Sequence, residues 1–397
     1  MVSTLRLGGP NRGRPVNAIE VPQIRSRAHV LTVPDRCRAV AVPDADAVAE
    51  YVGANAGAIT MGPTDTPFGR ALAITDRWGA ALSLIDRSSA EMASASRPDG
   101  RPVLIGRFAA MVNDAYPPKI DVQQAVARAL AEDLTPLGDL TSAMLPDGIT
   151  STSQMVVRGV GALAGRLCAA EAFHQVDPSI KIEWHADDGD SVGPMQKIAD
   201  ITGPLATVLE AERTALNFMG HLSGIATRVQ EFVQAVDGQI GVWDTRKTTP
   251  GLRSLEKAAV RAGGGRNHRG NLSDWLMFKD NHLTGMSIGE AVAAARDRWP
   301  ARTLHVECDR PDQVVEAVAA NADAILLDNM SPDEVRACIA IIGERRPDGR
   351  PLVEASGGIT IDTIASYADT GVDYVSSGSL TNSAPVLDIG LDIEIDR

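Results

Sequence analysis

Short runs of apolar residues recur at regular intervals along the second half of the chain. Each run is followed by polar residues and then by a stretch in which apolar side chains repeat with helical periodicity. The runs predict six strands, at residues 240–243, 275–278, 303–306, 324–327, 351–353 and 374–375. The periodic stretches predict helices at residues 287–298, 311–322, 331–342 and 360–370. Regular strand–helix alternation of this kind implies parallel strands joined by right-handed crossovers.

Polar residues stand at the carboxyl end of every predicted strand. They are Asp244 to Lys247, Lys279 to His282, Glu307, Asp328-Asn329, Glu354 with Ser356 to Gly358, and Ser376 to Gly378. A (β/α) barrel has this pattern, because its active site is built at the carboxyl ends of all its strands. An open α/β sheet would gather such residues at one switch point instead. We therefore predict a barrel with fewer strands than the usual eight.

The chain before residue 240 divides near Pro117-Pro118, where we place a domain boundary. After it, helices are predicted over 122–130 and 206–236, and strands over 153–158 and 163–167. Before the boundary, the pattern predicts an α+β module in which no motif carries identifiable chemistry. It begins with a lead-in (1–18), a strand (38–42), a helix with Asp44 as N-cap and an apolar run (56–61). Two strands within 70–87, joined at Arg77-Trp78-Gly79, follow, and then a loop (88–101) and an apolar segment (102–112).

Composition is that of a globular protein of more than one domain. The 397 residues are 44% hydrophobic and 22% charged. A net charge of −13 argues against coating nucleic acid or an anionic membrane, although it does not exclude a positive pocket. Four widely spaced cysteines predict reduced, mostly buried thiols. No signal-peptide core and no membrane-spanning run is found, so we expect a cytoplasmic protein.

One stretch reverses the acidic character of the chain. Between Arg246 and Lys279 the basic residues are Arg246, Lys247, Arg253, Lys257, Arg261, Arg266, Arg269 and Lys279, against two acids, Glu256 and Asp274. For Lys257 and Arg261 a solvated helix face is the favoured interpretation. For Arg246, Lys247 and Lys279 it fails, because cations at strand ends facing a barrel mouth need an anion, and guanidinium groups suit carboxylates and phosphates. The predicted ligand is small and carries several negative charges.

Further candidate ligand contacts lie at the other strand ends. His268 follows three glycines, Gly263 to Gly265, and is flanked by Arg269, which favours a ligand contact over a purely structural histidine. Glu307 and Asp328 end consecutive strands, where a carboxylate pair can hold Mg²⁺, accept ribose hydroxyl protons or stabilise a cationic transition state. Two salt bridges to nearby lysine or arginine are the alternative.

Two small-residue loops end the last two predicted strands. They are Ser356-Gly357-Gly358 and Ser377-Gly378-Ser379, and each is predicted to precede a helix. Glycine lets backbone N–H groups approach an anion, and many barrels bind phosphate at this position. The pair of loops predicts a phosphate site.

Residues 120–397 strongly resemble the quinolinate phosphoribosyltransferase family, also called carboxylating nicotinate-nucleotide pyrophosphorylases. The matching strings are GDLTS (138–142), AERTALNFMGHLSGIAT (211–227), DTRKTTPGLRSLEKAAVRAGGGRNHRGNLSDWLMFKDNHL (244–283), ILLDNM (325–330), EASGGIT (354–360) and SSGSLTNSAPVLDIGL (376–391). The resemblance implies phosphoribosyl transfer from phosphoribosyl pyrophosphate to quinolinate, with loss of pyrophosphate and CO₂, giving nicotinate mononucleotide for NAD biosynthesis.

The resemblance also implies a fold and an assembly. It implies an open α/β sandwich (119–223, with tail 384–397), a six-stranded (β/α) barrel (224–383), a Mg²⁺ requirement, and a homodimer or higher oligomer with shared active sites. The implied catalytic residues are Lys247, Lys279, Glu307 and Asp328, of which Glu307 and Asp328 would face the metal. The implied substrate-binding residues are these four with Arg213 (reaching into the neighbour's site), Thr245, Arg246, His268, Arg269, Ser356, Gly357, Gly358, Ser377, Gly378 and Ser379.

The sequence departs from the family mainly at its front. Residues 1–118 are additional to the family's usual chain, and they would form either a regulatory or partner-binding module or a structural appendage. A smaller departure is Gly159, which stands where the family usually has an acid, and we expect little consequence from it. One rival function is the same scaffold acting on a related pyridine carboxylate in specialised metabolism. A non-catalytic nucleotide sensor is the other. The retained set Arg213, Arg246, His268 and Arg269 favours a dicarboxylate acceptor.

Overall fold

The structure is a computed structural model that describes residues 116–343 and 351–395, together with the backbone of four earlier strands. The chain divides into two compact units, Met1–Leu104 and Ile105–Arg397. Among the described residues no helix is long and apolar enough to span a membrane.

The first unit contains a four-stranded sheet. Its strands are β1 (Ala39–Val42), β2 (Ala58–Thr66), β3 (Gly69–Thr75) and β4 (Ala81–Asp86), in the order β1-β4-β3-β2. β1 is parallel to β4, and the other pairs are antiparallel. The predicted strand at 38–42 and the pair within 70–87 are confirmed. The lead-in, the helix at Asp44, the loop 88–101 and the segment 102–112 lie outside the described residues.

The second unit begins with an α/β sandwich. An antiparallel sheet in the order β16-β5-β9-β7 is covered by helices, and β6 pairs with β8. The elements are α2 (Lys119–Leu134), η2 (Ser142–Met144), β5 (Thr150–Val157), β6 (Gly161–Ala162), α3 (Arg166–Val176), β7 (Lys181–Trp184), β8 (Ser191–Val192), β9 (Lys197–Pro204), α4 (Leu205–Ala235) and β16 (Ile389–Ile395). The helices predicted at 122–130 and 206–236 and the strand at 153–158 are confirmed.

The strand predicted at 163–167 is wrong. Gly165 has φ of 105°, which turns the chain, and α3 begins at the next residue. Leu163 and Ala164 are buried, and the backbone N–H of Ala164 donates to Ser223 Oγ of α4. An apolar run can thus be buried against a helix without joining a sheet.

The remainder of the second unit is a parallel six-stranded barrel. The strand order is β10-β15-β14-β13-β12-β11, so consecutive strands pair from β11 to β15, and the first strand, β10, pairs with the last, β15. The strands are β10 (Gly241–Trp243), β11 (Leu276–Phe278), β12 (Leu304–Cys308), β13 (Ala324–Asp328), β14 (Leu352–Ser356) and β15 (Tyr374–Ser376). All six predicted strands are confirmed. Between β10 and β11, Arg266 forms a parallel bridge with Trp243.

Helices and turns connect the barrel strands. They are α5 (Arg253–Ala262), η3 (Asp280–His282), α6 (Ile288–Arg298), α7 (Pro311–Ala319), α8 (Pro332–Ile342), η4 (Ile364–Tyr367) and α9 (Ser379–Asn382). α6 and α8 begin at capping boxes, Ser287 with Glu290 and Ser331 with Glu334. The helix predicted at 360–370 is only a 3₁₀ turn. The Thr363 hydroxyl bonds to the backbone N–H and carbonyl of Thr360 and to its hydroxyl, and these bonds compete with helical bonding.

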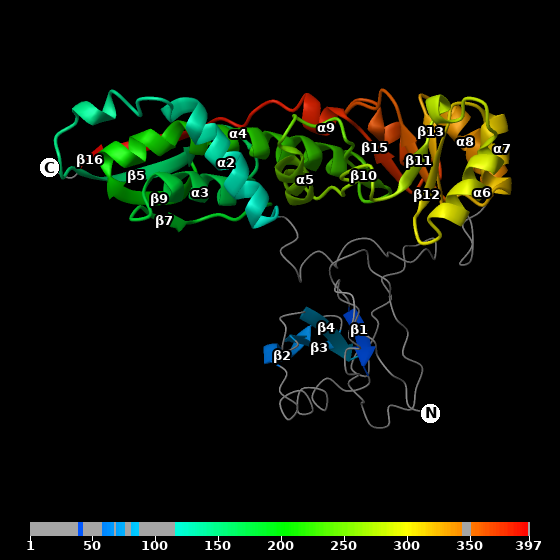
Figure 1. Cartoon of the computed structure of the whole chain (residues 1–397), viewed down its shortest axis with the longest axis horizontal. Helices are drawn as coiled ribbons and strands as arrows, with labels where there is room; N and C mark the ends of the chain where they lie inside the picture. Colours follow the sequence, from blue (N-terminus) through cyan, green and yellow to red (C-terminus); the bar gives the residue numbers. More distant parts are fainter. Residues whose placement is uncertain are drawn as a thin grey trace. The chain divides into compact units, whose positions relative to one another are not determined.

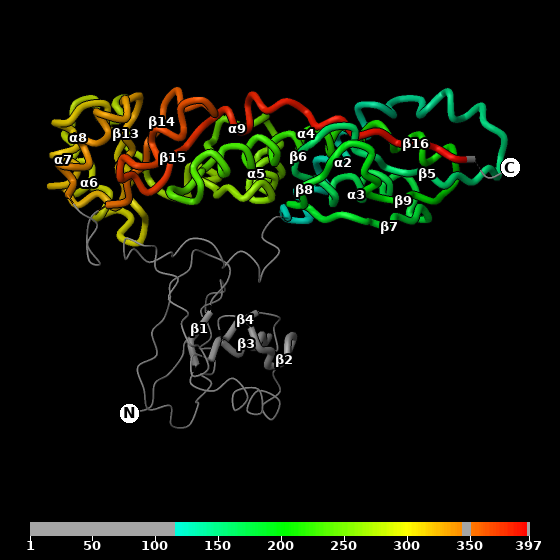
Figure 2. Tube along the Cα trace, turned by 180° about the vertical axis from the view of Figure 1, so that it is seen from behind, coloured from blue at the N-terminus to red at the C-terminus, as the bar shows by residue number. Residues whose placement is uncertain are grey.

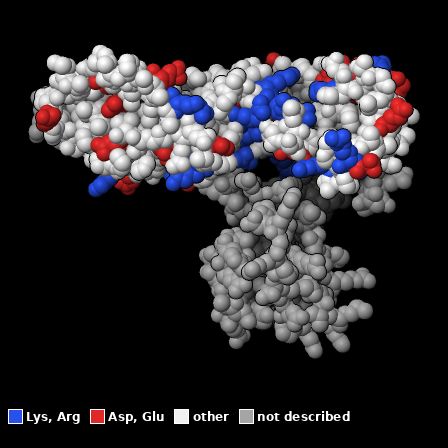
Figure 3. Space-filling view, in the orientation of Figure 1, with Lys and Arg blue, Asp and Glu red and all other residues white. Residues whose placement is uncertain are grey.

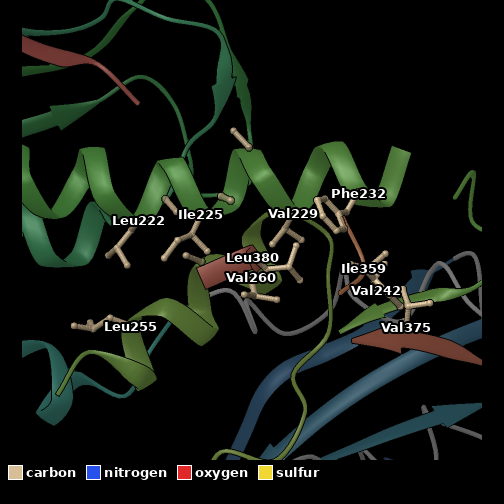
Figure 4. Packing of buried hydrophobic residues seen from close by; sticks show 14 of the residues in the cluster. Leu222, Ile225, Val229, Phe232, Val242, Leu255, Val260, Ile359, Val375 and Leu380 are labelled. Atoms are coloured by element: carbon tan, nitrogen blue, oxygen red, sulfur yellow. The ribbon is translucent and has the colours of Figure 1, made fainter. Parts of the chain in front are cut away.

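Helix α4 joins the sandwich to the barrel. Figures 1 and 2 show the sandwich and the barrel strands at opposite ends of this unit, with α4, α5 and α9 between them. Leu222, Ile225, Val229 and Phe232 of α4 point toward a buried set on the barrel side (Figure 4). That set is Val242, Leu255, Val260, Ile359, Val375 and Leu380. The two halves therefore share one continuous hydrophobic core.

The prediction of reduced, buried cysteine thiols is confirmed for the three cysteines that the structure describes. Cys168, Cys308 and Cys338 are buried free thiols, and Cys37 lies outside the described residues. Burial raises the pKa of Cys168 and of Cys308 to about 12, so both stay protonated at neutral pH.

Candidate active site

A buried aspartate fixes the end of the first barrel strand. Asp244 follows β10 and is 0% exposed. Its carboxylate accepts hydrogen bonds from Lys257 Nζ at 2.5 Å, from the His268 backbone N–H at 2.7 Å and from Asn267 Nδ2 at 2.8 Å. Burial raises the pKa of Asp244 and lowers that of Lys257, and the attraction between the two charges opposes both shifts. This aspartate holds the segment that carries His268 and Arg269.

Side chains of helix α5 donate hydrogen bonds to the backbone of the segments that carry Arg246 and His268. Lys257 is buried and also donates to the His268 carbonyl at 2.9 Å. Arg253 donates to the carbonyls of Arg246 and Gly270, at 3.4 and 3.2 Å. The solvated-face interpretation of Lys257 and Arg261 is therefore wrong. Arg261 donates to Asn267 Oδ1 and to the Tyr116 carbonyl.

A buried and a half-buried arginine lie beside this segment. Arg269 is 8% exposed, and its Nη2 lies 3.4 Å from Met277 Sδ. Burial, and next the nearby charge of Arg246, lower the pKa of Arg269. The Nε of Arg246 and the indole Nε1 of Trp275 are buried without a hydrogen-bond partner. Buried donors without partners are costly, and an anionic ligand would satisfy them.

The predicted pair of strand-end acids is present, and each member has a different partner. Lys279 Nζ forms an ion pair with Glu307 on the neighbouring strand. Asp328, the last residue of β13, accepts a hydrogen bond from Asn329 Nδ2 at 2.6 Å. Burial raises the pKa of Asp328, against the opposing charges of Lys279 and Lys247. Lys247, Lys279, Glu307 and Asp328 therefore share one electrostatic neighbourhood.

The two small-residue loops lie side by side at the ends of β14 and β15. Ser356 Oγ lies 3.0 Å from Ser376 Oγ, and Ser377 Oγ donates to the Ile359 carbonyl at 2.9 Å. A Cβ on Gly378 would lie 2.7 Å from Lys247 Cδ, so the absence of a side chain there makes room for the lysine. Only the second loop directly precedes a helix, the four-residue α9, and the prediction of a helix after the first loop is wrong.

The remaining predicted site residues lie at the edge of this group. Thr245 Oγ1 accepts from the Lys247 backbone N–H at 3.0 Å and so closes the turn after β10. Arg213 lies on α4, where its side chain is 67% exposed and 3.7 Å from Glu212. Figure 3 shows Lys and Arg side chains gathered over the region that α5, α9 and β10 occupy in Figure 1.

Two buried polar residues of this region, Glu354 and His305, were given no role by the sequence pattern. Glu354 of β14 accepts from His268 Nε2 at 3.2 Å and from Ser376 Oγ. His305 of β12 is also buried against Glu354. The available signal was a charged residue inside a short apolar run, with one residue between His305 and Glu307, since alternate strand residues face the same side.

The donor chemistry distinguishes two possible cation sites. Glu307 and Asp328 offer carboxylate oxygens near several lysines, and Mg²⁺ is bound by one or two carboxylates together with substrate phosphates. These two residues fit such an ion when a phosphorylated substrate supplies further oxygens. His268, His305 and Glu354 also bring ligand atoms within 4.8 Å of one another, but their two nitrogens do not suit Mg²⁺.

Comparisons with known proteins point to one family. Residues 139–223 match the model of the quinolinate phosphoribosyl transferase N-terminal domain, and residues 225–392 match that of its C-terminal domain. A probable nicotinate-nucleotide pyrophosphorylase [carboxylating] of Bacillus subtilis is 42% identical over 263 residues, 66% of this chain and 89% of the relative. That of Mycobacterium leprae is 39% identical over 279 residues, covering 68% and 96%. A solved nicotinate-nucleotide pyrophosphorylase of Francisella tularensis superposes with a TM-score of 0.66 at 34% identity, covering 70% and 98%.

Proposed function

The chain belongs to the quinolinate phosphoribosyltransferase family, and on this premise we propose how its barrel performs the family's reaction. The enzyme transfers phosphoribose from phosphoribosyl pyrophosphate to quinolinate, with loss of pyrophosphate and CO₂, and makes nicotinate mononucleotide in de novo NAD biosynthesis. The observation that carries the proposal is the set of buried donors around Arg246, His268 and Arg269.

Quinolinate binds where cations are buried with unsatisfied donors. Arg246, His268 and Arg269 receive its two carboxylates, with Thr245 at the turn between them and β10. Burial and the nearby charge of Arg246 lower the pKa of Arg269, and a bound dianion would neutralise both guanidinium groups. A monocarboxylate would leave one of them unpaired.

The phosphoribosyl donor binds on the other side of the barrel mouth. Lys247 and Lys279 face its pyrophosphate, and Glu307 and Asp328 face its ribose. The serine–glycine loops, Ser356-Gly357-Gly358 and Ser377-Gly378-Ser379, hold the 5′-phosphate through backbone N–H groups. Their position at the ends of adjacent strands supports this assignment.

Transfer requires charge stabilisation rather than a covalent enzyme intermediate. As the bond from C1′ to pyrophosphate breaks, positive charge develops on the ribose, and Glu307 and Asp328 stabilise it. Lys247 and Lys279 stabilise the negative charge on the departing pyrophosphate. Lys279 is already paired with Glu307, so the two opposite charges are held in place before substrate arrives. The ribosylated ring nitrogen then accepts the electrons released by loss of CO₂.

Magnesium completes this proposal. Glu307 and Asp328 would hold Mg²⁺, directly or through water, and the ion would supply further neutralisation of the leaving group. The second unit would contain the sandwich (119–223 with 384–397) and the barrel (224–383), with 1–118 as an additional module. The protein would work in the cytoplasm as a homodimer, in which Arg213 of one subunit meets the substrate of the other.

One assay tests the function. Purified full-length protein with quinolinate, phosphoribosyl pyrophosphate and Mg²⁺ should release one CO₂ for each nicotinate mononucleotide formed. Nicotinate should replace quinolinate poorly, because it lacks the second carboxylate. Turnover of nicotinate in preference to quinolinate would refute the dicarboxylate assignment, and chelation of Mg²⁺ without loss of rate would refute the metal requirement.

A further inference from the structure

One carboxylate is enclosed inside the barrel below the strand-end residues. Glu354 is the third residue of β14 and is 0% exposed. The titratable or charged groups that influence it come from the surrounding elements: His268 after β10, Arg269, His305 on β12, Asp328 on β13 and Tyr374 on β15. Ser376 on β15 is a neutral donor to it. A buried charge persists only when it is well paired, so this arrangement calls for an explanation.

The two histidines contact the same carboxylate oxygen with different geometry. His268 Nε2 makes a hydrogen bond of 3.2 Å to Glu354 Oε2. His305 Nε2 lies 3.4 Å from the same oxygen, yet it is buried without a hydrogen-bond partner. Oε1 is taken by Ser376 Oγ. His268 is therefore the histidine that Glu354 binds.

His305 and Glu354 carry different charges at neutral pH. Burial lowers the pKa of His305 to about 4, so this ring is neutral at neutral pH. Burial by itself would raise the pKa of Glu354, but the hydrogen bond and charge of His268, with His305 and Ser376, bring it below the ordinary value. Glu354 is therefore an anion, and burial raises the pKa of Tyr374 beside it, which keeps that hydroxyl a neutral donor.

The aromatic neighbours restrict how the His268 ring can turn. It stacks on His305, with centroids 5.7 Å apart and planes at 28°, and it meets the edge of Trp275 at 4.9 Å. With Nε2 bonded to Glu354, the remaining polar atom of the ring is Nδ1, which has no partner among the described residues. Nδ1 can donate to a substrate carboxylate only when both ring nitrogens carry protons.

We propose that Glu354 is a positioning residue that holds the His268 ring so that its Nδ1 faces the carboxylates of quinolinate. His305 and Trp275 fix the ring plane from two sides. The inference rests on the proposed role of His268 in binding quinolinate and adds what makes that role possible.

Kinetics with two variants tests the proposal. Glu354→Gln keeps the shape of the side chain but removes its charge, and should raise the KM for quinolinate roughly tenfold to a hundredfold, as for a lost charged hydrogen bond. The KM for phosphoribosyl pyrophosphate should change much less. Glu316→Gln, at a half-buried carboxylate that accepts a backbone N–H of Gly289 at 3.1 Å, is the matched control.

A double-mutant cycle separates positioning from a general structural role. In a His268→Ala background, Glu354→Gln should have little further effect on the KM for quinolinate, because the residue through which it acts is gone. Additive effects, or an equal rise in both KM values, would overturn the proposal. So would one zinc ion per purified chain that is lost in His305→Gln, since the cluster would then be a metal site with neutral histidines.

A measurement without substrate keeps this test independent of the enzyme's function. In proton NMR of the free full-length protein, a ring N–H resonance of His268 should lie far downfield, disappear in Glu354→Gln and persist in Glu316→Gln. Failure to turn over quinolinate with this resonance present would refute the proposed function only. Absence of the resonance in an active wild-type enzyme would refute the positioning role only.

Discussion

Lys257 Nζ lies 2.5 Å from Asp244 Oδ1, and the two side chains are 8% and 0% exposed. The pair joins helix α5 to the end of β10, and through Asp244 it also fixes the backbone of His268. The basic residues proposed to bind the substrate are thus supported by a basic residue that does not face solvent. This buried pair is the structural basis of the anion site.

Lys257→Met should therefore destabilise the fold and impair binding together. Removing one partner of a buried ion pair leaves an uncompensated charge, so we expect a loss of about 3–5 kcal/mol in the free energy of unfolding, measured by urea denaturation. Adding Asp244→Asn should recover part of this loss, because the buried charge is then absent. A single variant as stable as the wild type would contradict the pairing, and Lys197→Met, at an exposed pair with Asp200, is the control.

The Lys279–Glu307 pair should matter for rate more than for stability. The Lys279 side chain is 40% exposed, so its removal costs little folding energy, whereas it faces the proposed leaving group. Lys279→Met should lower kcat about 10²- to 10³-fold, the range for loss of one preorganised charge-stabilising donor. Steady-state kinetics and thermal denaturation measure the two effects. A variant with unchanged kcat would exclude this lysine from catalysis.

Sequence patterning predicted the barrel well, because strands buried inside a parallel barrel are uninterrupted apolar runs ending in polar residues. It failed at 163–167, where an equally apolar run turns at Gly165 and packs against α4. It also failed at 360–370, where the Thr363 hydroxyl bonds to the backbone of Thr360. Apolar character indicates burial, but the partner that buries a segment is decided by the tertiary structure.

The site was predictable where its residues end strands and not where they lie inside them. Lys279, Glu307 and Asp328 follow directly from the strand pattern. Lys257 was assigned to solvent, because helical spacing does not reveal that Asp244 lies opposite it. The pattern placed Glu354 at a strand end but gave it no role, since its partners His268 and Ser376 come from other parts of the barrel.

Helix α4 should not tolerate a side chain where the C-terminal tail crosses it. A Cβ added at Gly224 would lie 2.0 Å from the Pro385 carbonyl oxygen, in the segment that leads from α9 to β16. Gly224→Ala should therefore lower the free energy of unfolding by about 1–3 kcal/mol, as for overpacked cores. Gly193→Ala is the control, because a Cβ there meets nothing within 4 Å. Equal stability of the two variants would contradict the close crossing.

Asp139 should make stability depend on pH in the acidic range. Bonds from the Ser142 hydroxyl and backbone N–H, and from the Thr141 backbone N–H, lower its pKa. Because the folded-state pKa is depressed, the stabilisation is present above the unfolded value of about 3.9 and is lost as pH falls through the folded-state value. The difference in urea midpoint between wild type and Asp139→Asn should shrink below about pH 4. A difference that is constant between pH 6 and pH 3 would contradict this assignment.

The exposed position of Arg213 leads to a test of shared active sites. Its side chain is 67% exposed on α4 and has Glu212 as its ion-pair partner, at 3.7 Å. Arg213→Ala and Glu307→Ala should each be nearly inactive. In a homodimer with sites shared between subunits, random mixing makes half of the dimers mixed, and each of these has one intact site of two, so about a quarter of wild-type activity should return. Native mass spectrometry verifies the exchange, and exchange without recovered activity would place Arg213 in the site of its own subunit or outside the site altogether.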